Sequence, residues 1–184
     1  MLISLTGSLV KMTLIYEPSE DSELMLGTLK SRVKNKQFKI LEMGVGSGYI
    51  LENLKKVGFT NLSGVDKNPE AVSLCKNKNL YVYFSNLFSQ VKDKFDIIFF
   101  NPPYLPKDKN EDKESEVITT GGKEGSEIIN KFLKDVKKYL TPNGRAFLLN
   151  STLTKGIKWP ESKRAIVGEK KLFFEKLVVW ELTF

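Results

Sequence analysis

Short apolar runs alternate along this chain with longer amphipathic stretches, and this alternation limits how the chain can fold more than any other feature. The runs that predict strands are Phe38–Met43, Leu62–Asp66, Leu80–Phe84, Phe95–Asn101, Arg145–Asn150 and a terminal pair within Arg164–Phe184. Strands that are buried on both faces are continuously apolar, and parallel strands need crossover connections between them. We therefore expect an α/β fold in which helices cover both faces of a mostly parallel sheet.

The amphipathic stretches predict the helices. The clearest one extends from about Gly125 to Leu140, and Pro142-Asn143-Gly144 is expected to stop it. An earlier helix is expected to begin near Pro18, because proline is tolerated in the first turn and Asp21 and its acidic neighbours suit the positive end of the helix dipole. The segment Ser151–Ser162 is too short, and too interrupted by glycine and proline, for a full crossover helix. The hydrophobic finish Lys171–Leu182 has no helix of its own before it, and a turn signal before the last strand would make an antiparallel hairpin at one sheet edge.

Length and composition predict one domain over residues 1–184, with residues 1–13 as a short N-terminal extension. No apolar run approaches the ~20 residues of a membrane helix, and the first residues lack the features of a secretory signal. We therefore expect a cytoplasmic protein that does not enter a membrane. One cysteine and no histidine exclude a disulfide framework, a self-contained cysteine zinc site and imidazole catalysis.

The formal net charge of +7 suggests an anionic partner. Nucleic acid is compatible with this charge but is not indicated by it, because the basic residues are scattered and form no tract.

The first predicted strand leads into the glycine-rich turn Glu42–Gly48. Glycines permit positive φ there and let a ligand press against the backbone. Such a turn also suits a dinucleotide, but Glu42 would repel a pyrophosphate and attract the ammonium of an amino-acid-like ligand. Asp66 closes the second predicted strand, where a ribose diol would lie. These features favour S-adenosylmethionine over a nicotinamide cofactor. The candidate residues of this region are Glu42, Gly44, Gly46, Gly48 and Asp66.

Asn86 and Leu87 follow the third predicted strand. A side-chain amide beside an apolar residue could bracket an adenine ring, although an asparagine in a loop is most often a turn residue.

The tetrapeptide Asn101-Pro102-Pro103-Tyr104 directly follows the fourth predicted strand. An amide or aromatic amine is a weak nucleophile, so a site that alkylates it must accept its N–H hydrogens and orient it. The Asn101 side-chain oxygen and the Pro102 carbonyl are suitable acceptors, Pro103 stiffens the turn, and Tyr104 can stack on the planar group. The nitrogen becomes acidic as its charge develops, so no strong base is needed.

Together these motifs resemble the class I S-adenosylmethionine-dependent methyltransferases, and Asn-Pro-Pro-Tyr resembles their amino-methylating branch. The segment Ile15–Ser22 closely resembles the Tyr-Glu-Pro-Ala/Ser-Glu-Asp-Thr/Ser opening of the HemK-like release-factor glutamine methyltransferases of the archaeal and eukaryotic type. Gly121–Gly125 is similar to that family's Gly-Gly-x-x-Gly stretch, and Phe173–Leu177 resembles its terminal strand. The likeness extends from about Thr13 to Phe184.

The resemblance implies a Rossmann-like seven-stranded sheet of order 3-2-1-4-5-7-6. It also implies N5-methylation of the glutamine in the Gly-Gly-Gln motif of a class 1 translation termination factor. The residues implied to hold S-adenosylmethionine are Tyr16, Pro18, Ser22, Glu42, Gly44, Gly46, Asp66, Asn86 and Leu87, and Asn101 borders the cofactor. The residues implied to hold the substrate glutamine are Asn101, Pro102, Pro103 and Tyr104.

Short members of this family lack an amino-terminal recognition domain, and the resemblance implies a small zinc-binding activator subunit that completes a heterodimer. In the implied sheet order, Leu80–Phe84 is the edge strand. An apolar, aromatic edge strand is an aggregation hazard unless something covers it. We expect the activator to dock there, and cover by helices of this domain is the alternative.

Three other functions stay open. A nucleic-acid amino methyltransferase, acting at N6 of adenine or N2 of guanine, also fits Asn-Pro-Pro-Tyr, but it would be expected to carry a target-recognition module for which 184 residues leave little room. A protein lysine methyltransferase could hold a neutral amine in the same pocket. A cofactor-binding subunit without activity is the third, and the intact Asn101–Tyr104 argues against it.

Overall fold

The computed structural model describes residues 15–107 and 120–184, so the expected extension at residues 1–13 lies outside the described residues. The strands are β1 (Ile40–Met43), β2 (Leu62–Asp66), β3 (Val82–Phe84), β4 (Phe95–Phe100), β5 (Leu140–Ser151), β6 (Lys163–Lys171) and β7 (Lys176–Thr183). The helices are α1 (Glu20–Arg32), α2 (Tyr49–Lys56), α3 (Pro69–Asn77) and α5 (Glu127–Asp135), and α5 continues into the 3₁₀ turn η1 (Val136–Tyr139). Within these two ranges, no helix has the length and apolar character to cross a membrane.

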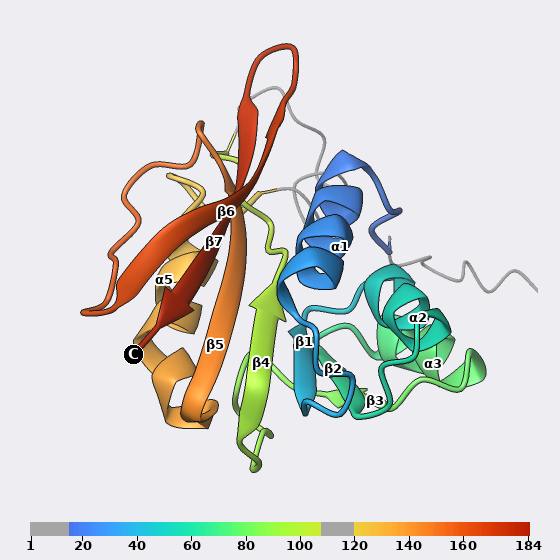
Figure 1. The fold of residues 1–184 in the computed structure, drawn as a ribbon. Helices are drawn as coiled ribbons and strands as arrows, with labels where there is room; N and C mark the ends of the chain where they lie inside the picture. Colours follow the sequence, from blue (N-terminus) through green and yellow to red (C-terminus); the bar gives the residue numbers. More distant parts are fainter. Residues whose placement is uncertain (1–14, 108–119) are drawn as a thin grey trace, which may run out of the picture.

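The described strands form one sheet of order β3-β2-β1-β4-β5-β7-β6 (Figure 1). The five strands β3, β2, β1, β4 and β5 are parallel to one another, and β7 is antiparallel to both β5 and β6. The expected sheet order and terminal hairpin are confirmed, and residues 151–162 contain no helix. Because β2 and β4 pair on opposite sides of β1, the strand order reverses there. Open α/β sheets bind ligands at such a switch point, outside the carboxyl ends of the strands.

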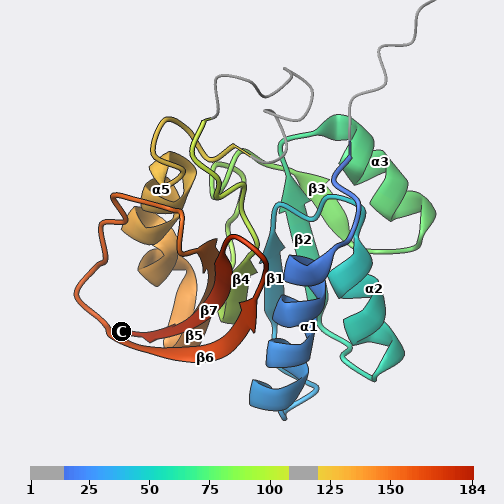
Figure 2. The same cartoon turned by 90° about the horizontal axis from the view of Figure 1, so that it is seen from above.

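Alternate residues of the central strands face two separate cores. Ile40 of β1 and Ile97 of β4 pack in the core beneath α1, α2 and α3. Their neighbours Leu41 and Ile98 pack in the other core, beneath α5. Figure 2 shows α5 on the opposite side of the sheet from α1 and α2. The continuous apolar runs are therefore explained by burial of both strand faces, and the predicted α/β fold with helices on both faces is confirmed.

The edge strand β3 is shorter than the predicted strand Leu80–Phe84. The N–H of Leu80 donates to the Cys75 carbonyl at 3.1 Å and so completes the end of α3, and the strand begins only at Val82. Its edge position is confirmed.

The helix predicted over Gly125–Leu140 is also shorter, and the expectation that Pro142-Asn143-Gly144 stops it is wrong. Gly125 has a φ of +83°, outside the helical region, so α5 begins after it. At the other end, Leu140 has extended angles of φ −89° and ψ 147° and pairs with Phe95 of β4. The tripeptide lies inside β5, where the register with β4 shifts; a bulge of this kind accommodates proline in a strand.

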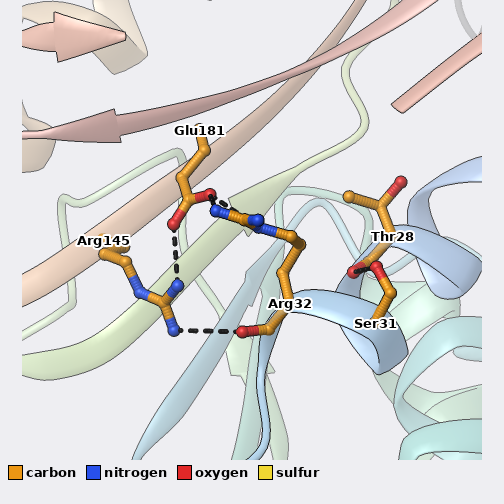
Figure 3. A network of polar contacts seen from close by, with 5 residues as sticks. All are labelled: Thr28, Ser31, Arg32, Arg145 and Glu181. Atoms are coloured by element: carbon orange, nitrogen blue, oxygen red, sulfur yellow. Dashed lines mark hydrogen bonds and ion pairs between the residues drawn. The ribbon is translucent and has the colours of Figure 1, made fainter. Parts of the chain in front are cut away.

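A buried carboxylate joins the last strand to the first helix (Figure 3). Glu181 of β7 accepts from Arg32 at the end of α1 and from Arg145 of β5, each at 2.7 Å. Arg145 also donates to the Arg32 carbonyl at 3.5 Å. Because both Glu181 oxygens have cationic partners, the cost of burying the carboxylate is offset. The network holds α1 against the sheet, and the opposite end of α1 borders the site.

Candidate active site

A cavity of about 820 Å³ opens at the switch point, beyond the carboxyl ends of β1, β2 and β4. The predicted site residues that line it are Tyr16, Ser22, Glu42, Gly44, Gly46, Asp66, Asn86, Leu87, Asn101, Pro102, Pro103 and Tyr104. Pro18 is exposed before α1 and Gly48 is packed behind the turn, and neither is part of the lining, so their cofactor roles stay predictions. The fold thus brings together residues that lie far apart in the sequence.

The turn after β1 has the backbone that its glycines allow. Gly44, Gly46 and Gly48 have φ values of +68°, +52° and +79°, where an L side chain is strained. A Cβ at Gly48 would lie 2.8 Å from the Cys75 sulfur, so this glycine lets α3 approach the turn. The Gly46 N–H donates to Asp66 at 3.0 Å, which fixes the turn to the end of β2.

Glu42 is a buried acid of the site. It is 3% exposed, and its Oε2 has no hydrogen-bond partner within the described residues. Burial, reinforced by the charge of Asp66, raises the pKa of the Glu42 carboxyl well above its usual range. A buried acceptor without a partner is costly unless a ligand satisfies it. The ammonium group of S-adenosylmethionine is such a ligand, so these residues fit the amino-acid end of that cofactor.

The loop after β3 presents Asn86 and Leu87 to the cavity. Leu87 has a φ of +50°, and the Ser85 hydroxyl donates to its carbonyl at 2.6 Å. The Ser89 hydroxyl accepts from the backbone N–H of Asn86 at 3.2 Å, and Asn86 itself is exposed. The loop geometry is therefore held by serines that flank the predicted pair.

The turn after β4, Asn101–Tyr104, is the predicted acceptor turn and lines the cavity. The Oδ1 atom of Asn101 is buried and has no hydrogen-bond partner within residues 15–107 and 120–184. Pro102 beside it is buried. The carbonyl of Tyr104 accepts from the Thr154 hydroxyl at 2.8 Å, so the loop after β5 supports the end of the turn. An orphaned amide oxygen inside the cavity is suited to accept an N–H from a substrate nitrogen.

Asp21 is a site residue that the sequence analysis missed, because it was assigned only to the helix dipole. Its side chain lines the cavity, is 3% exposed and accepts from the hydroxyls of Tyr16 at 2.8 Å and Tyr104 at 3.4 Å. Burial, with the charge of Asp21 adding to it, raises the pKa of both tyrosines, so both hydroxyls stay protonated. Asp21 thereby connects the predicted cofactor segment to the predicted acceptor turn. Its place within Ile15–Ser22 was the only sequence signal for this role.

The glycine segment before α5 supports the acceptor turn from behind. Gly121 donates to the Leu105 carbonyl at 3.0 Å, and Thr120 forms a β-bridge with Leu105. A Cβ at Gly121 would lie 2.5 Å from the Pro103 carbonyl oxygen, and one at Gly125 would collide with the Tyr104 carbonyl oxygen. The segment therefore needs glycine because backbone packs on backbone.

We expect Gly121→Ala to displace the acceptor turn and lower the turnover rate by about a hundredfold, since small displacements of a positioned group have effects of this size. Cofactor affinity, measured by calorimetry, should change little. Gly27→Ala in α1 is the control, because no atom would lie within 4 Å of a Cβ at that position. That variant should gain up to about 1 kcal/mol in stability at unchanged activity. A Gly121→Ala enzyme with full turnover would show that the turn does not depend on this support.

This strand order, with the glycine turn and the acidic strand ends around one cavity, defines a class I S-adenosylmethionine-dependent methyltransferase. Residues 18–156 match the model of the family "Methyltransferase small domain". A relative from Methanocaldococcus jannaschii, provisionally named a protein N5-glutamine methyltransferase, is 40% identical over 99% of this chain and 100% of its own length. The chain belongs to the methyltransferase small domain family and is a methyltransferase.

Two further proteins are similar to this chain. A release factor glutamine methyltransferase of Borreliella burgdorferi is 34% identical over 69% of this chain, but this chain spans only 50% of that protein. The solved structure of the E. cuniculi Mtq2–Trm112 complex, described as methylating the termination factor eRF1, superposes with a TM-score of 0.72 at 21% identity, over 91% of this chain and 97% of that one. At that identity the superposition shows the fold.

Proposed function

We propose that this chain methylates N5 of a glutamine side chain in a class 1 translation termination factor, namely the glutamine of its Gly-Gly-Gln motif. The observation that carries the proposal is the buried Oδ1 of Asn101, which shares one cavity with Oε2 of Glu42; neither atom has a hydrogen-bond partner in the part of the chain that the structure describes. Asn101 Oδ1 suits a neutral N–H donor, and Glu42 Oε2 suits a cation. The names of the M. jannaschii and B. burgdorferi relatives support glutamine as the acceptor.

In this proposal, Glu42 holds the cofactor's ammonium group, Asp66 its ribose, and Asn86 with Leu87 its adenine. Tyr16, Pro18, Ser22 and the glycines at 44, 46 and 48 complete the cofactor pocket. S-adenosylmethionine, when bound, supplies a methyl group activated by its sulfonium charge.

The acceptor turn orients the amide and limits its hydrogen bonding. Asn101 Oδ1 and the Pro102 carbonyl accept the two N–H hydrogens of the glutamine amide, and Tyr104 packs against its plane. The amide then faces the cofactor with its nitrogen aligned for transfer. Its proton leaves after charge develops on the nitrogen, so the site works without a strong base.

We further propose a heterodimer with a small zinc-binding activator that docks on the edge strand β3. Tyr81 just before this strand is 73% exposed and Phe84 at its end is 53% exposed, so the edge is apolar and open. Mtq2 was solved as a two-protein complex with Trm112, and this supports a partner here.

We also propose that residues 1–184 form one domain. We place the reaction in the cytoplasm because termination factors act at the ribosome.

One assay tests the substrate. The chain, with and without a candidate activator, is incubated with labelled S-adenosylmethionine and a termination factor that carries either Gly-Gly-Gln or Gly-Gly-Asn. We expect label only on the Gly-Gly-Gln protein. Label that persists on the Gly-Gly-Asn variant would exclude the glutamine assignment.

A further inference from the structure

The tip of the β6–β7 hairpin exposes two adjacent aromatic side chains. Phe173 is 92% exposed and Phe174 is 85% exposed, and their rings meet edge-on with centroids 4.8 Å apart. The Leu172 N–H donates to the Glu175 carbonyl at 2.8 Å, so both phenylalanines lie at the centre of a tight turn. Such positions usually hold glycine, proline, asparagine or aspartate. Neither the turn nor packing within the described residues accounts for two phenylalanines there.

Hydrogen bonds connect this tip to the acceptor turn. Lys176, the first residue of β7, accepts from the Thr152 N–H at 2.9 Å and donates its own N–H to the Thr152 hydroxyl at 3.0 Å. Two residues further on, the Thr154 hydroxyl donates to the Tyr104 carbonyl at 2.8 Å. The tip and Tyr104 are therefore supported by the same short segment after β5.

The tip also lies beside the start of α1. Lys170 is 3.9 Å from both Glu20 and Glu23, and Figure 1 shows the hairpin projecting past the sheet at the end toward which β4 points. Burial, and after it the charges of Asp21, Tyr16 and Glu175, raise the pKa of Tyr104. The Oε2 of Glu175 is buried and has no hydrogen-bond partner among the described residues. The tip therefore lies next to the start of α1, where Asp21 and Ser22 line the cavity, although no residue from Leu172 to Lys176 lines it.

The position of the pair favours the protein substrate over the activator. In the sheet order, β6 and β3 form opposite edges, so the tip lies far across the sheet from the exposed Tyr81 and Phe84. A substrate that brings its glutamine to Asn101 must cover the rim around Tyr104. Exposed aromatic pairs of this kind serve as anchors in protein recognition.

We propose that Phe173 and Phe174 are the docking point for an apolar side chain of the termination factor close to its acceptor glutamine. The proposal rests on the proposed function, because it names the same substrate. It gives the chain two separate protein-binding surfaces, one for the activator at β3 and one for the substrate at the hairpin. Both partners can then bind at once.

The test compares steady-state methylation of the intact termination factor by wild-type enzyme and by the double variant Phe173→Ser/Phe174→Ser, each with its activator. We expect the KM for the protein substrate to rise at least about tenfold, which is the usual scale for loss of an interface anchor. Turnover at saturation and cofactor affinity should stay within about twofold. The variant Phe173→Leu/Phe174→Leu should keep KM within about threefold, because an apolar anchor remains.

Val57→Ser is the matched control, since Val57 is 42% exposed at the end of α2, away from the hairpin. An unchanged KM in the serine double variant, with active wild type, would refute the docking point and leave the proposed function standing. Loss of activator binding by that variant, or a change in its oligomeric state, would assign the tip to another partner and refute the proposal too. Wild-type enzyme that leaves the termination factor unmodified would refute both.

Discussion

Replacing Asn101 by alanine should lower the rate of methyl transfer by roughly a thousandfold while cofactor affinity stays within about threefold of wild type. The carboxamide Oδ1 has no hydrogen-bond partner among the described residues, so it is available to accept a hydrogen bond from the substrate. Removal of one preorganised polar group from a transition state has effects of about this size. Single-turnover kinetics with labelled cofactor measure the rate, and calorimetry measures the affinity.

Asn150→Ala is the matched control, because Asn150 lies near the corresponding end of the neighbouring strand β5. Its side chain accepts from the Trp180 indole at 2.9 Å and donates to the Ser151 carbonyl at 2.8 Å, and it does not line the cavity. We expect this variant to lose stability but keep its transfer rate below its melting temperature. If Asn101→Ala instead weakened cofactor binding strongly and kept its transfer rate, Asn101 would be a cofactor residue.

Replacing Glu42 by glutamine should weaken S-adenosylmethionine binding by about a hundredfold, as expected when one partner of a buried charged pair is neutralised. The substitution should also remove the pH dependence of cofactor affinity. Because burial raises the pKa of Glu42, the free protein holds a proton there above the ordinary value of 4.5. A bound ammonium favours the ionised form, so wild-type affinity should rise with pH as the carboxyl ionises. Calorimetry over a pH series separates the two effects.

The raised pKa of Glu42 also affects the stability of the free protein. Between the ordinary and the raised pKa of Glu42, the folded state binds more protons than the unfolded state, so stability should fall as pH rises through that window. Glu52→Gln is the control for the binding measurement, since Glu52 is on the surface of α2 and pairs with Lys56 at 3.0 Å and with Lys78 at 3.5 Å. A Glu42→Gln variant that keeps the wild-type pH profile of binding would show that another group interacts with the ammonium.

Much of the site could be predicted from single segments of the sequence. Parallel strands end at the same edge of the sheet, so motifs that directly follow apolar runs must meet there. This places Glu42, Asp66 and Asn101 around one cavity without knowledge of the strand order. The edge strand could be named only through the family resemblance.

Contacts between distant segments could not be predicted. Asp21 looks like an ordinary first-turn acid, and its bond to Tyr104 spans 83 residues. Likewise, the end of α5 depends on the pairing of Leu140 with Phe95, which overrides the helical spacing of the sequence.

The sequence by itself determined the α/β fold, the methyl donor and the acceptor turn, because each depends on local periodicity or on a short motif at a strand end. Only the tertiary structure decided which buried polar atoms lack partners and which surfaces remain open. Asn101 Oδ1, Glu42 Oε2 and the exposed pair at 173–174 are defined by what the folded chain does not place against them, within the residues that the structure describes. That is a property of packing in three dimensions, and no single segment of the chain contains it.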